Sequence, residues 1–438
     1  MASSPPPSRA ETATANFCWE PIVGEQVIIE RLGAKADGIA ETASGPVFVP
    51  KTLPGETVTI ERDGSRADLI RVDAASPERE TPFCPYFDEC GGCATQHMKH
   101  GFYQAWKQEI LARTLRQARI ETPVEPMIDA HGDGRRRVTL HVRFPDRSMH
   151  VGYMAARSHR IVAIAFCPIA EPGLKEQAPV IARAIGEHLK GARKPLDIQI
   201  TNTRTGFDVD VRGHGPLKDS DRLSLIGLAE RLDLSRLSIH GDVIVERRPP
   251  AIAMGRASVV PPAGSFLQAT RLGEETLASF VTEACGRAKR VADLFSGSGP
   301  FALRLAEKSE VHAVEHDQGS MTALDKAFRA TPGLRRITTE ARDLFRRPLL
   351  TPELNAFDAV VLDPPRAGAE AQAKQLAASK VPLVVSVSCD AATFARDTAI
   401  LTSGGYRLER VIPVDQFKHS PHLEVIGILR RDAVKKRR

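Results

Sequence analysis

The sequence predicts an α/β fold in which the C-terminal part, residues 263–438, forms a Rossmann-like parallel sheet. There, short apolar runs alternate with helix-like runs in the order strand, helix, strand, helix. Two of these runs, Val360–Leu362 and Val384–Val387, end abruptly in polar residues. Buried parallel strands have this pattern when their carboxyl ends open onto a binding crevice. Upstream, the pattern instead predicts a small β-barrel over residues 17–77 and an α+β insert over residues 78–262.

Length and composition indicate a globular protein of two or three domains. The chain has 438 residues, of which 42% are hydrophobic and 26% are charged. No apolar run approaches the roughly 20 residues that cross a bilayer, and the N-terminus lacks the apolar centre of a signal peptide. We therefore expect a cytoplasmic protein with no membrane partner, whose cysteines are ligands, catalysts or fillers rather than disulfide partners.

The charge pattern favours a nucleic acid as partner, and no feature indicates an obligate protein partner. The formal net charge is +6, and arginine and lysine gather in short clusters. Such clusters can follow a phosphate backbone, although any single one is more often a solvated surface. The clusters are Arg135–Arg137, Arg247–Arg248, Arg335–Arg336, Arg346–Arg347 and Lys435–Arg438.

The N-terminal region divides into a tail and a barrel. Residues 1–16 are rich in Pro, Ser, Ala and Thr, which predicts disorder. Short alternating segments separated by glycine-containing turns follow, and they predict the strands of a small antiparallel barrel. Barrels of the OB type commonly bind RNA, although the pattern does not separate them from other small β modules. The segments are Gln26–Glu30, Pro46–Val49 and Thr57–Glu61.

Four cysteines in the next region can converge on one metal centre. Cys84, Cys90 and Cys93 lie in one short stretch with glycines that allow a tight wrap, and Cys167 supplies a fourth thiolate. Three clustered ligands and one distant ligand favour iron and sulfur over zinc, since a zinc site of four cysteines usually pairs two short knuckles. The pattern alone leaves the metal open.

The rest of the insert carries no pattern from which we infer chemistry. Helices are predicted over residues 104–120, 177–189 and 220–232, and strand-like pieces over residues 138–142 and 196–200. Several histidines show no metal-ligand spacing and are expected to be structural or on the surface; they are His131, His141, His159 and His214.

The first strand of the C-terminal region runs into a glycine turn, Asp293–Pro300, which predicts a nucleoside site. The glycines let backbone amides approach a ligand at the start of the helix over residues 301–307. Glu315 ends the next strand about twenty positions later, where a carboxylate can accept hydrogen bonds from both ribose hydroxyls. Asp343 lies where an adenine amino group would fall, and Asp363 ends a later strand. Because no phosphate-binding lysine or arginine-rich loop follows the glycines, S-adenosylmethionine fits better than NAD.

Cys389 follows the strand over residues 384–387 and is the predicted nucleophile. A cysteine in such a place can also be a small core filler. This one follows a buried strand, lies between Ser388 and Asp390, and comes after a nucleoside-binding pattern. We therefore expect its sulfur to point into the site and to react there.

Four motifs carry a resemblance to a known family: Asp293–Gly299, Leu362–Gly368, Ser386–Asp390 and Phe417–Glu424. Through them, nearly the whole chain from Phe17 onwards resembles the S-adenosylmethionine-dependent RNA 5-methyluridine methyltransferases. It is most similar to those with a TRAM domain and a [4Fe-4S] cluster, such as the 23S ribosomal RNA uracil-5 methyltransferases. The resemblance implies a class I methyltransferase domain after residue 262, a TRAM-like barrel and a central RNA-binding domain.

The resemblance also implies a role for individual residues. It makes Cys389 the nucleophile and Glu424 the general base. The ligands of the [4Fe-4S] cluster that it implies are Cys84, Cys90, Cys93 and Cys167. Around S-adenosylmethionine it places Gln268, Phe295, Pro300, Glu315, Asp343 and Asp363. This chain has Phe417-Lys-His-Ser420 where some members have Phe-Pro-His-Thr, so the shape of the loop before Glu424 is left open.

Methylation of uracil needs these residue types. Carbon 5 is a poor nucleophile, so a thiolate must first add to carbon 6 and generate an enolate that attacks the sulfonium methyl group. A free thiol, with a pKa of about 8.5, is mostly protonated at neutral pH, so we expect the site to lower that pKa or to remove the proton as the bond forms. A base, Glu424, must then take the proton from carbon 5. The target uridine must be unstacked, which favours a folded RNA loop as substrate.

Several alternatives stay open at this point. Glu424 could be a surface acid paired with Arg430 or Lys418, and Asp363 could bind the pyrimidine edge as well as the donor. Asp-Pro-Pro turns also occur in enzymes that methylate exocyclic amines, but Arg366 stands where those enzymes usually have an aromatic residue. A non-catalytic RNA-binding factor would have no need of intact donor-site residues. Ribosomal RNA is the expected substrate by family analogy alone, with transfer RNA as the alternative.

Overall fold

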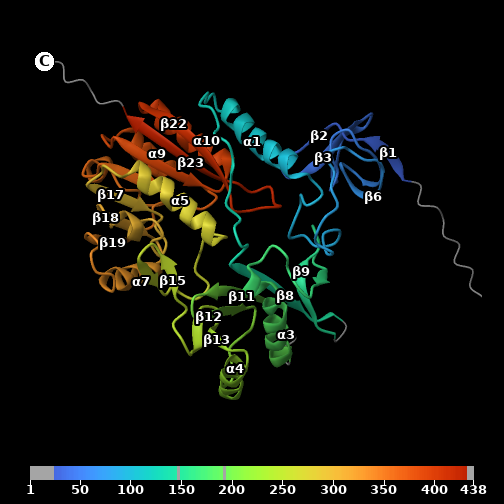
Figure 1. Ribbon diagram of the computed structural model, residues 1–438, viewed down its shortest axis with the longest axis horizontal. Helices are drawn as coiled ribbons and strands as arrows, with labels where there is room; N and C mark the ends of the chain where they lie inside the picture. The colour runs from blue at the N-terminus through green and yellow to red at the C-terminus, as the bar shows by residue number, and fades with distance from the viewer. Residues whose placement is uncertain (1–23, 146–147, 191–193, 432–438) are drawn as a thin grey trace, which may run out of the picture. The chain divides into compact units, whose positions relative to one another are not determined.

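A computed structural model describes residues 24–145, 148–190 and 194–431, and Figure 1 shows its helices and strands. The tail predicted to be disordered, residues 1–16, lies outside the described residues. The described residues divide into two compact units, one made of residues 24–33 and 37–77 and one made of residues 34–36 and those from 78 onwards. In the described ranges, no helix combines the length and the apolar character needed to cross a membrane.

The first unit is a small β-barrel, as the alternating pattern predicted. Its strands hydrogen bond in the order β1-β5-β6-β4-β3-β2. A single bent stretch closes it, because β1 pairs with β5 while its continuation through Glu30 into β2 pairs with β3. The barrel is not wholly antiparallel, since β4 and β6 pair in parallel. The strands are β1 (Glu25–Ile28), β2 (Arg31–Leu32), β3 (Asp37–Thr42), β4 (Gly45–Pro50), β5 (Thr57–Asp63) and β6 (Arg66–Ala74).

The middle of the second unit is an α+β layer on a seven-stranded sheet in the order β10-β9-β8-β11-β12-β13-β14. β12 and β13 run parallel because helix α4 crosses over between them, and the other pairs are antiparallel. Alternate residues of the strands, such as Leu140 and Ile198, share a core with α3. The strands are β8 (Arg137–Arg143), β9 (His150–Met154), β10 (Ile161–Ala163), β11 (Leu196–Thr203), β12 (Gly206–Arg212), β13 (Leu234–Ile239) and β14 (Asp242–Glu246). The helices are α2 (Pro172–Lys175), α3 (Gln177–Leu189) and α4 (Asp219–Arg231).

The C-terminal part is an eight-stranded sheet in the order β19-β18-β17-β20-β21-β23-β22-β7. The five strands from β19 to β21 are parallel, as predicted, and β23 is antiparallel to both its neighbours. Every residue of β20 and β21 is buried because helices cover both faces of the sheet. Helices α5, α6 and α7 share a core with one face, and α8, α9 and α10 with the other.

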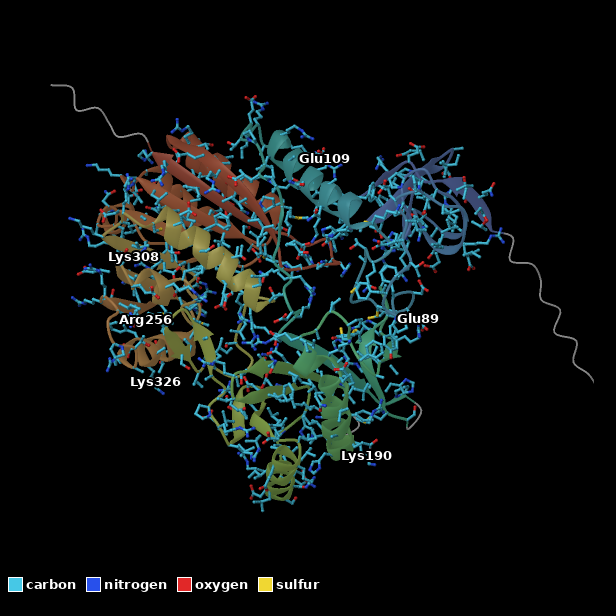
Figure 2. All side chains as sticks on the ribbon, in the orientation of Figure 1. Glu89, Glu109, Lys190, Arg256, Lys308 and Lys326 are labelled. Atoms are coloured by element: carbon cyan, nitrogen blue, oxygen red, sulfur yellow. The ribbon has the colours of Figure 1, made fainter. Side chains whose placement is uncertain are left out.

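The strands of this sheet are β17 (Arg290–Leu294), β18 (Glu310–Glu315), β19 (Ile337–Ala341), β20 (Ala359–Leu362), β21 (Leu383–Ser388), β22 (Tyr406–Asp415) and β23 (Glu424–Arg431). The helices are α5 (Arg271–Ala284), α6 (Ala302–Leu305), α7 (Gln318–Arg329), α8 (Thr351–Leu354), α9 (Glu370–Ala377) and α10 (Ala391–Ser403). A hairpin of β15 (Ile252–Met254) and β16 (Ala257–Val259) joins the core beside α7. Charged side chains such as Lys190, Lys308 and Lys326 project from the outer surfaces (Figure 2).

Two elements that precede the insert in sequence complete the C-terminal sheet. Helix α1 (His100–Gln117) packs on the same face as α10, and β7 (Ile128–Asp129) pairs in parallel with β22. A buried ion pair joins α1 to the sheet, because Lys107 Nζ lies 2.7 Å from Asp415 Oδ1. The helix predicted over residues 104–120 begins earlier, at His100, and also ends earlier, at Gln117. It ends there because Arg119 adopts a left-handed conformation (φ 58°) that cannot continue a helix.

Candidate active site

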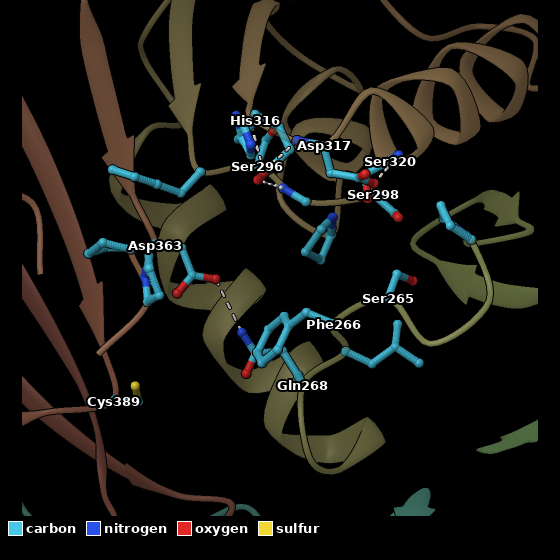
Figure 3. A pocket seen from close by; sticks show the side chains of 18 of the residues that line it. Ser265, Phe266, Gln268, Ser296, Ser298, His316, Asp317, Ser320, Asp363 and Cys389 are labelled. Carbon is cyan, nitrogen blue, oxygen red and sulfur yellow. Dashed lines mark hydrogen bonds between the residues drawn. The ribbon is translucent and has the colours of Figure 1, made fainter. Parts of the chain in front are cut away.

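The carboxyl ends of the parallel strands open onto one pocket of about 770 Å³. Figure 3 shows Asp363, Gln268 and Cys389 around this pocket, on segments that are far apart in the sequence. Every donor-site and catalytic residue predicted from the sequence lines it: Gln268, Phe295, Pro300, Glu315, Asp343, Asp363, Cys389 and Glu424. The predicted grouping of these residues therefore holds in space.

The turn after β17 forms one wall of the pocket, on the side predicted to bind the methyl donor. Phe295 (φ 62°) and Gly297 (φ 51°) are both left-handed, so the chain turns sharply at the pocket wall. Glu315 holds the turn, because its carboxylate accepts hydrogen bonds from the backbone N–H of Gly297 (3.1 Å) and of His316 (2.6 Å). At Gly299 a Cβ would lie 2.4 Å from Leu324, so only glycine fits there.

Two aromatic rings lie beside Asp343. The ring centroids of Phe295 and Phe345 are 5.5 Å apart, and Phe345 is half exposed. The Asp343 carboxylate accepts a hydrogen bond from the backbone N–H of Phe345 (3.0 Å), which ties the loop to the acid. The arrangement suits a flat, aromatic ligand with an amino group, as the sequence predicted for adenine.

The pairing of β21 with β23 brings Cys389 close to Glu424. The two strands are antiparallel with Ser388 opposite Val425, so the next residue of β21 lies beside the first residue of β23. The loop before Glu424 turns tightly: His419 is left-handed (φ 62°), and Ser420 N donates to Phe417 O (3.1 Å). The Lys-His-Ser sequence thus forms a compact turn that leaves Glu424 at the start of β23.

Glu424 is not a surface acid. Its side chain is buried, and burial raises its pKa to about 7, against which a hydrogen bond from Gln416 acts. Arg430 pairs with Glu409, and Lys418 pairs with Asp129. The alternative in which Glu424 pairs with Arg430 or Lys418 is therefore wrong.

The surroundings of Cys389 raise the pKa of its thiol to about 11. From the sequence we expected the site either to lower this pKa or to remove the proton as the bond forms, and the raised pKa is opposite to the first expectation. Burial is the largest cause, and the negative charges of Glu424 and Asp363 add to it. Arg366, which also hydrogen bonds His422 (3.0 Å), acts in the other direction. The protein groups around Cys389 therefore do not lower the thiol pKa.

Comparison with known proteins identifies the family. A family model described as tRNA (uracil-5-)-methyltransferase matches residues 226–432. An RNA methyltransferase of Brucella suis biovar 1 is 44% identical over 92% of this chain and 97% of its own length. The 23S rRNA (uracil(1939)-C(5))-methyltransferase RlmD of Chromohalobacter salexigens is 32% identical, over 92% of this chain and 89% of its own. The chain belongs to the S-adenosylmethionine-dependent RNA uracil-5-methyltransferases.

The fold of this RNA uracil-5-methyltransferase is also found in a solved structure. The tRNA (uracil-54, C5)-methyltransferase of Pyrococcus abyssi, in complex with S-adenosyl-L-homocysteine, superposes with a TM-score of 0.72. The match covers 92% of this chain and 99% of the other at 22% identity. This likeness shows a common fold, including the N-terminal sheet unit.

A buried charge network ties the donor side of the methyltransferase pocket to the central sheet. Arg136, at the start of that sheet, contacts Glu274 of α5 (2.6 Å) and donates to the backbone oxygen of Gln268 (2.9 Å). Arg304 contacts the other oxygen of Glu274 (3.1 Å) and donates to the backbone oxygen of Pro300 (2.6 Å). Two of the predicted donor-site residues are thus held through their backbones by this network.

Sequence reasoning missed Gln416, which lies between the two halves of the site. Its amide donates to Gln268 and to Glu424 from the loop that follows β22. An isolated amide at a strand end gives no periodic or compositional signal. The one available clue was its place immediately before the Phe417–Glu424 motif.

The four cysteines surround a hollow of about 350 Å³ that is separate from the methyltransferase pocket. Cys84, Cys90, Cys93 and Cys167 all line it, and all are free thiols. Among the described residues, no three His, Cys, Asp or Glu side chains converge as they would on a single metal ion. Among the histidines expected to be structural or on the surface, His141 pairs with Asp197 (2.8 Å).

Proposed function

We propose that this enzyme methylates carbon 5 of one uridine in 23S ribosomal RNA by transient addition of Cys389 to the base. The observation that carries the proposal is the meeting of Cys389 and Glu424 in the pocket that also holds the donor-site residues. A nucleophile and a base on neighbouring strands can act on carbons 6 and 5 of the same ring. An enzyme that methylates exocyclic amines has no use for that pair.

Seven side chains surround the methyl donor in this proposal. Glu315 accepts hydrogen bonds from the ribose hydroxyls, and Asp343 accepts one from the adenine amino group between the rings of Phe295 and Phe345. Gln268 and Asp363, joined by a hydrogen bond of 3.2 Å, lie on the side toward Cys389. Pro300 contacts the donor from the end of the glycine turn.

The reaction begins with a covalent bond from Cys389 Sγ to carbon 6 of uracil. The electrons of the carbon 5–carbon 6 double bond move to the carbonyl oxygen on carbon 4, and the resulting enolate takes the methyl group at carbon 5. The carbon–sulfur bond of the donor breaks and leaves S-adenosylhomocysteine. Glu424 then takes the proton from carbon 5, the double bond forms again, and Cys389 leaves as a thiolate.

The thiol proton is the main electrostatic problem for this reaction. With a pKa raised to about 11 by burial and two carboxylates, Cys389 is protonated at rest. S-adenosylmethionine supplies a positively charged sulfonium, and a cation near a thiol favours its thiolate. Donor binding therefore prepares the nucleophile, and the thiol proton is lost to water before the first turnover.

The cysteine hollow is the site of a [4Fe-4S] cluster in this proposal, with Cys84, Cys90, Cys93 and Cys167 as ligands. A single zinc ion needs all its thiolates about 2.3 Å from one point. Thiols that surround a hollow of about 350 Å³ without such convergence fit a larger group. The cluster would join the Cys84–Cys93 stretch to the turn at Cys167 and so hold the central domain together. Anaerobic reconstitution followed by iron and sulfide analysis tests this, and stoichiometric zinc in its place would refute it.

The barrel of residues 17–77 and the central domain of residues 78–262 bind the RNA in this proposal, and residues 263–438 carry out the methylation. The barrel corresponds to a TRAM domain. Ribosomal RNA is supported over transfer RNA by the relative that is 32% identical, since the transfer RNA enzyme is similar in fold alone.

The test is mass mapping of ribosomal and transfer RNA from a strain that lacks the enzyme, complemented either with the natural chain or with Cys389→Ala. One 5-methyluridine in 23S ribosomal RNA should disappear and return only with the natural chain. A missing transfer RNA methyl group would instead assign the enzyme to transfer RNA, and no missing methyl group in either RNA would refute the proposal.

A further inference from the structure

Gln416 is completely buried at the junction between β22 and the loop that leads to Glu424. Three groups from two parts of the chain surround its amide: the backbone N–H of Ala269, the side chain of Gln268 and the carboxylate of Glu424. Helix α5 makes room for it, because a Cβ at Gly273 would lie 2.7 Å from both the Cβ and the Oε1 of Gln416. A glycine at that position lets the amide reach the site.

The hydrogen bonds fix which way the amide of Gln416 points. Its Oε1 accepts from Ala269 N (2.9 Å), and a backbone N–H can only donate. Its Nε2 then donates both protons, one to Gln268 Oε1 (2.6 Å) and one to Glu424 Oε1 (3.1 Å). In the flipped amide, the protons on Nε2 would face the N–H of Ala269, and Oε1 would face the oxygens Gln268 Oε1 and Glu424 Oε1, so all three hydrogen bonds would be lost. All the donors and one acceptor of this amide are therefore used in a single arrangement.

This arrangement determines the direction of two neighbouring side chains. Since Gln268 Oε1 accepts from Gln416, the Nε2 of Gln268 faces the other way and donates to Asp363 Oδ2 (3.2 Å). On Glu424, Oε1 is held, while Oε2 is buried without a hydrogen-bond partner in the described part of the chain. A carboxylate oxygen held out of water with no donor is ready to accept a proton from a ligand.

We propose that Gln416 is a positioning residue that holds Glu424 by Oε1, leaving Oε2 to take the proton from carbon 5, and that fixes the amide of Gln268 toward the methyl donor. The inference rests on the proposed function. One side chain thereby positions both the base, Glu424, and part of the site for the methyl donor. Glu424 and the donor both react with uracil, so the same group orients the two.

The charges that face Glu424 agree with this role. Besides burial, the charge of Glu424 raises the pKa of Asp363, which follows β20, and of Cys389, which follows β21, while Arg366 lowers the pKa of Cys389. When Asp363 or Cys389 is ionised, its negative charge opposes the charge of Glu424 and it has no proton to donate. The amide of Gln416, in contrast, donates at every pH. Its hydrogen bond favours the ionised base, and its removal should raise the pKa of Glu424 above about 7.

The experiment compares Gln416→Leu and Gln416→Glu with the natural enzyme. Leucine keeps the volume and loses the hydrogen bonds, while glutamate keeps an acceptor for Ala269 N–H but repels Glu424. For Gln416→Leu we expect the acidic limb of the kcat pH profile to move up by about one pH unit, since a hydrogen bond to a charged group is lost. Calorimetry without RNA should show S-adenosylmethionine binding weakened several-fold. Gln416→Glu should impair the base further.

Gln372→Leu is the matched control. Gln372 is also completely buried and hydrogen bonded at both ends, to Leu349 N (2.9 Å) and Leu349 O (3.1 Å), but it lies in α9 away from the pocket. It should lower the thermal midpoint without moving the pH profile. If Gln416→Leu lowers the rate equally at every pH and binds the donor normally, Gln416 is only structural and the inference is overturned.

A separate readout distinguishes failure of this inference from failure of the proposed function. Ribosomal RNA from the deletion strain should be methylated by the natural enzyme, and the Gln416→Leu enzyme should accumulate a covalent RNA adduct near neutral pH because the methylated base loses its proton more slowly. Methylation by the natural enzyme without an accumulated adduct in the variant contradicts the role of Gln416 alone. No methylation and no adduct with the natural enzyme contradicts the proposed function.

Discussion

Replacing Glu424 by glutamine should remove activity and, at alkaline pH, stabilise the fold. Burial raises the pKa of Glu424 from 4.5 to about 7, so the folded protein holds the ionised acid at a cost. A group whose pKa is raised on folding favours the folded state below its unfolded pKa and loses that contribution as the pH rises through the folded pKa. Glutamine never ionises, so it escapes the loss.

The size of the effect follows from the two pKa values. At pH 5 the ionised acid is a small part of the folded population, whereas at pH 8 most of it is ionised in both states. With 1.36 kcal/mol per pKa unit, the cost of Glu424 to the free energy of unfolding grows by about 2 to 3 kcal/mol between pH 5 and pH 8. Constant effects of the substitution, such as an unpaired amide proton beside the former Oε2, cancel in this difference.

Urea unfolding of the natural chain and of Glu424→Gln at both pH values measures it. The difference in unfolding free energy, variant minus natural, should be larger at pH 8 than at pH 5 by that amount. Glu353→Gln is the control: Arg342 lowers the pKa of Glu353 below 4.5, so this acid is mostly ionised in both states from pH 5 to pH 8 and the difference for its variant should hardly change over that range. An equal difference at both pH values for Glu424→Gln would refute the burial of a titrating base.

Three further predictions concern the nucleophile, its ionisation and the central domain. Cys389→Ala should form no covalent adduct with 5-fluorouridine RNA, whereas the natural chain should be trapped; an adduct in the variant, seen by denaturing gel, would assign another nucleophile. The ultraviolet absorbance of the Cys389 thiolate should appear at lower pH with S-adenosylmethionine than with uncharged S-adenosylhomocysteine, and equal titration with both would contradict the role given to the sulfonium. Arg136→Leu should lower the free energy of unfolding by about 3 kcal/mol. This is the lower end for a broken buried ion pair, because Arg304 still contacts Glu274. Unchanged thermal stability would show that the pair contributes nothing.

The local elements and the members of the pocket could be predicted because they depend on short patterns. The strands before Asp363 and Cys389 are rich in valine and wholly buried, and parallel strands of one sheet end at the same edge. This rule alone places Glu315, Asp363 and Cys389 near one another. The helix over residues 177–189 followed in the same way from its apolar periodicity.

What depends on contacts between distant segments could not be predicted. The pKa of Cys389 is raised first by burial and then by the charges of Glu424 and Asp363, and these charges lie near the thiol only once β23 and β20 have paired with β21. Gln416 acquires its role from Ala269 and Gln268, which no spacing rule connects to it. The two-residue strand β7 is too short to show any periodicity.

Because α1 and β7 close the catalytic sheet ahead of the insert, this sheet is assembled from both ends of the chain. During synthesis, residues 100–129 must wait for β22, and the Lys107–Asp415 pair forms across 308 positions of sequence. Such distant closure slows folding. A fragment that begins at residue 263 would leave the outer edge of β22 bare and prone to aggregate, even though it contains Cys389, Glu424 and most of the donor site.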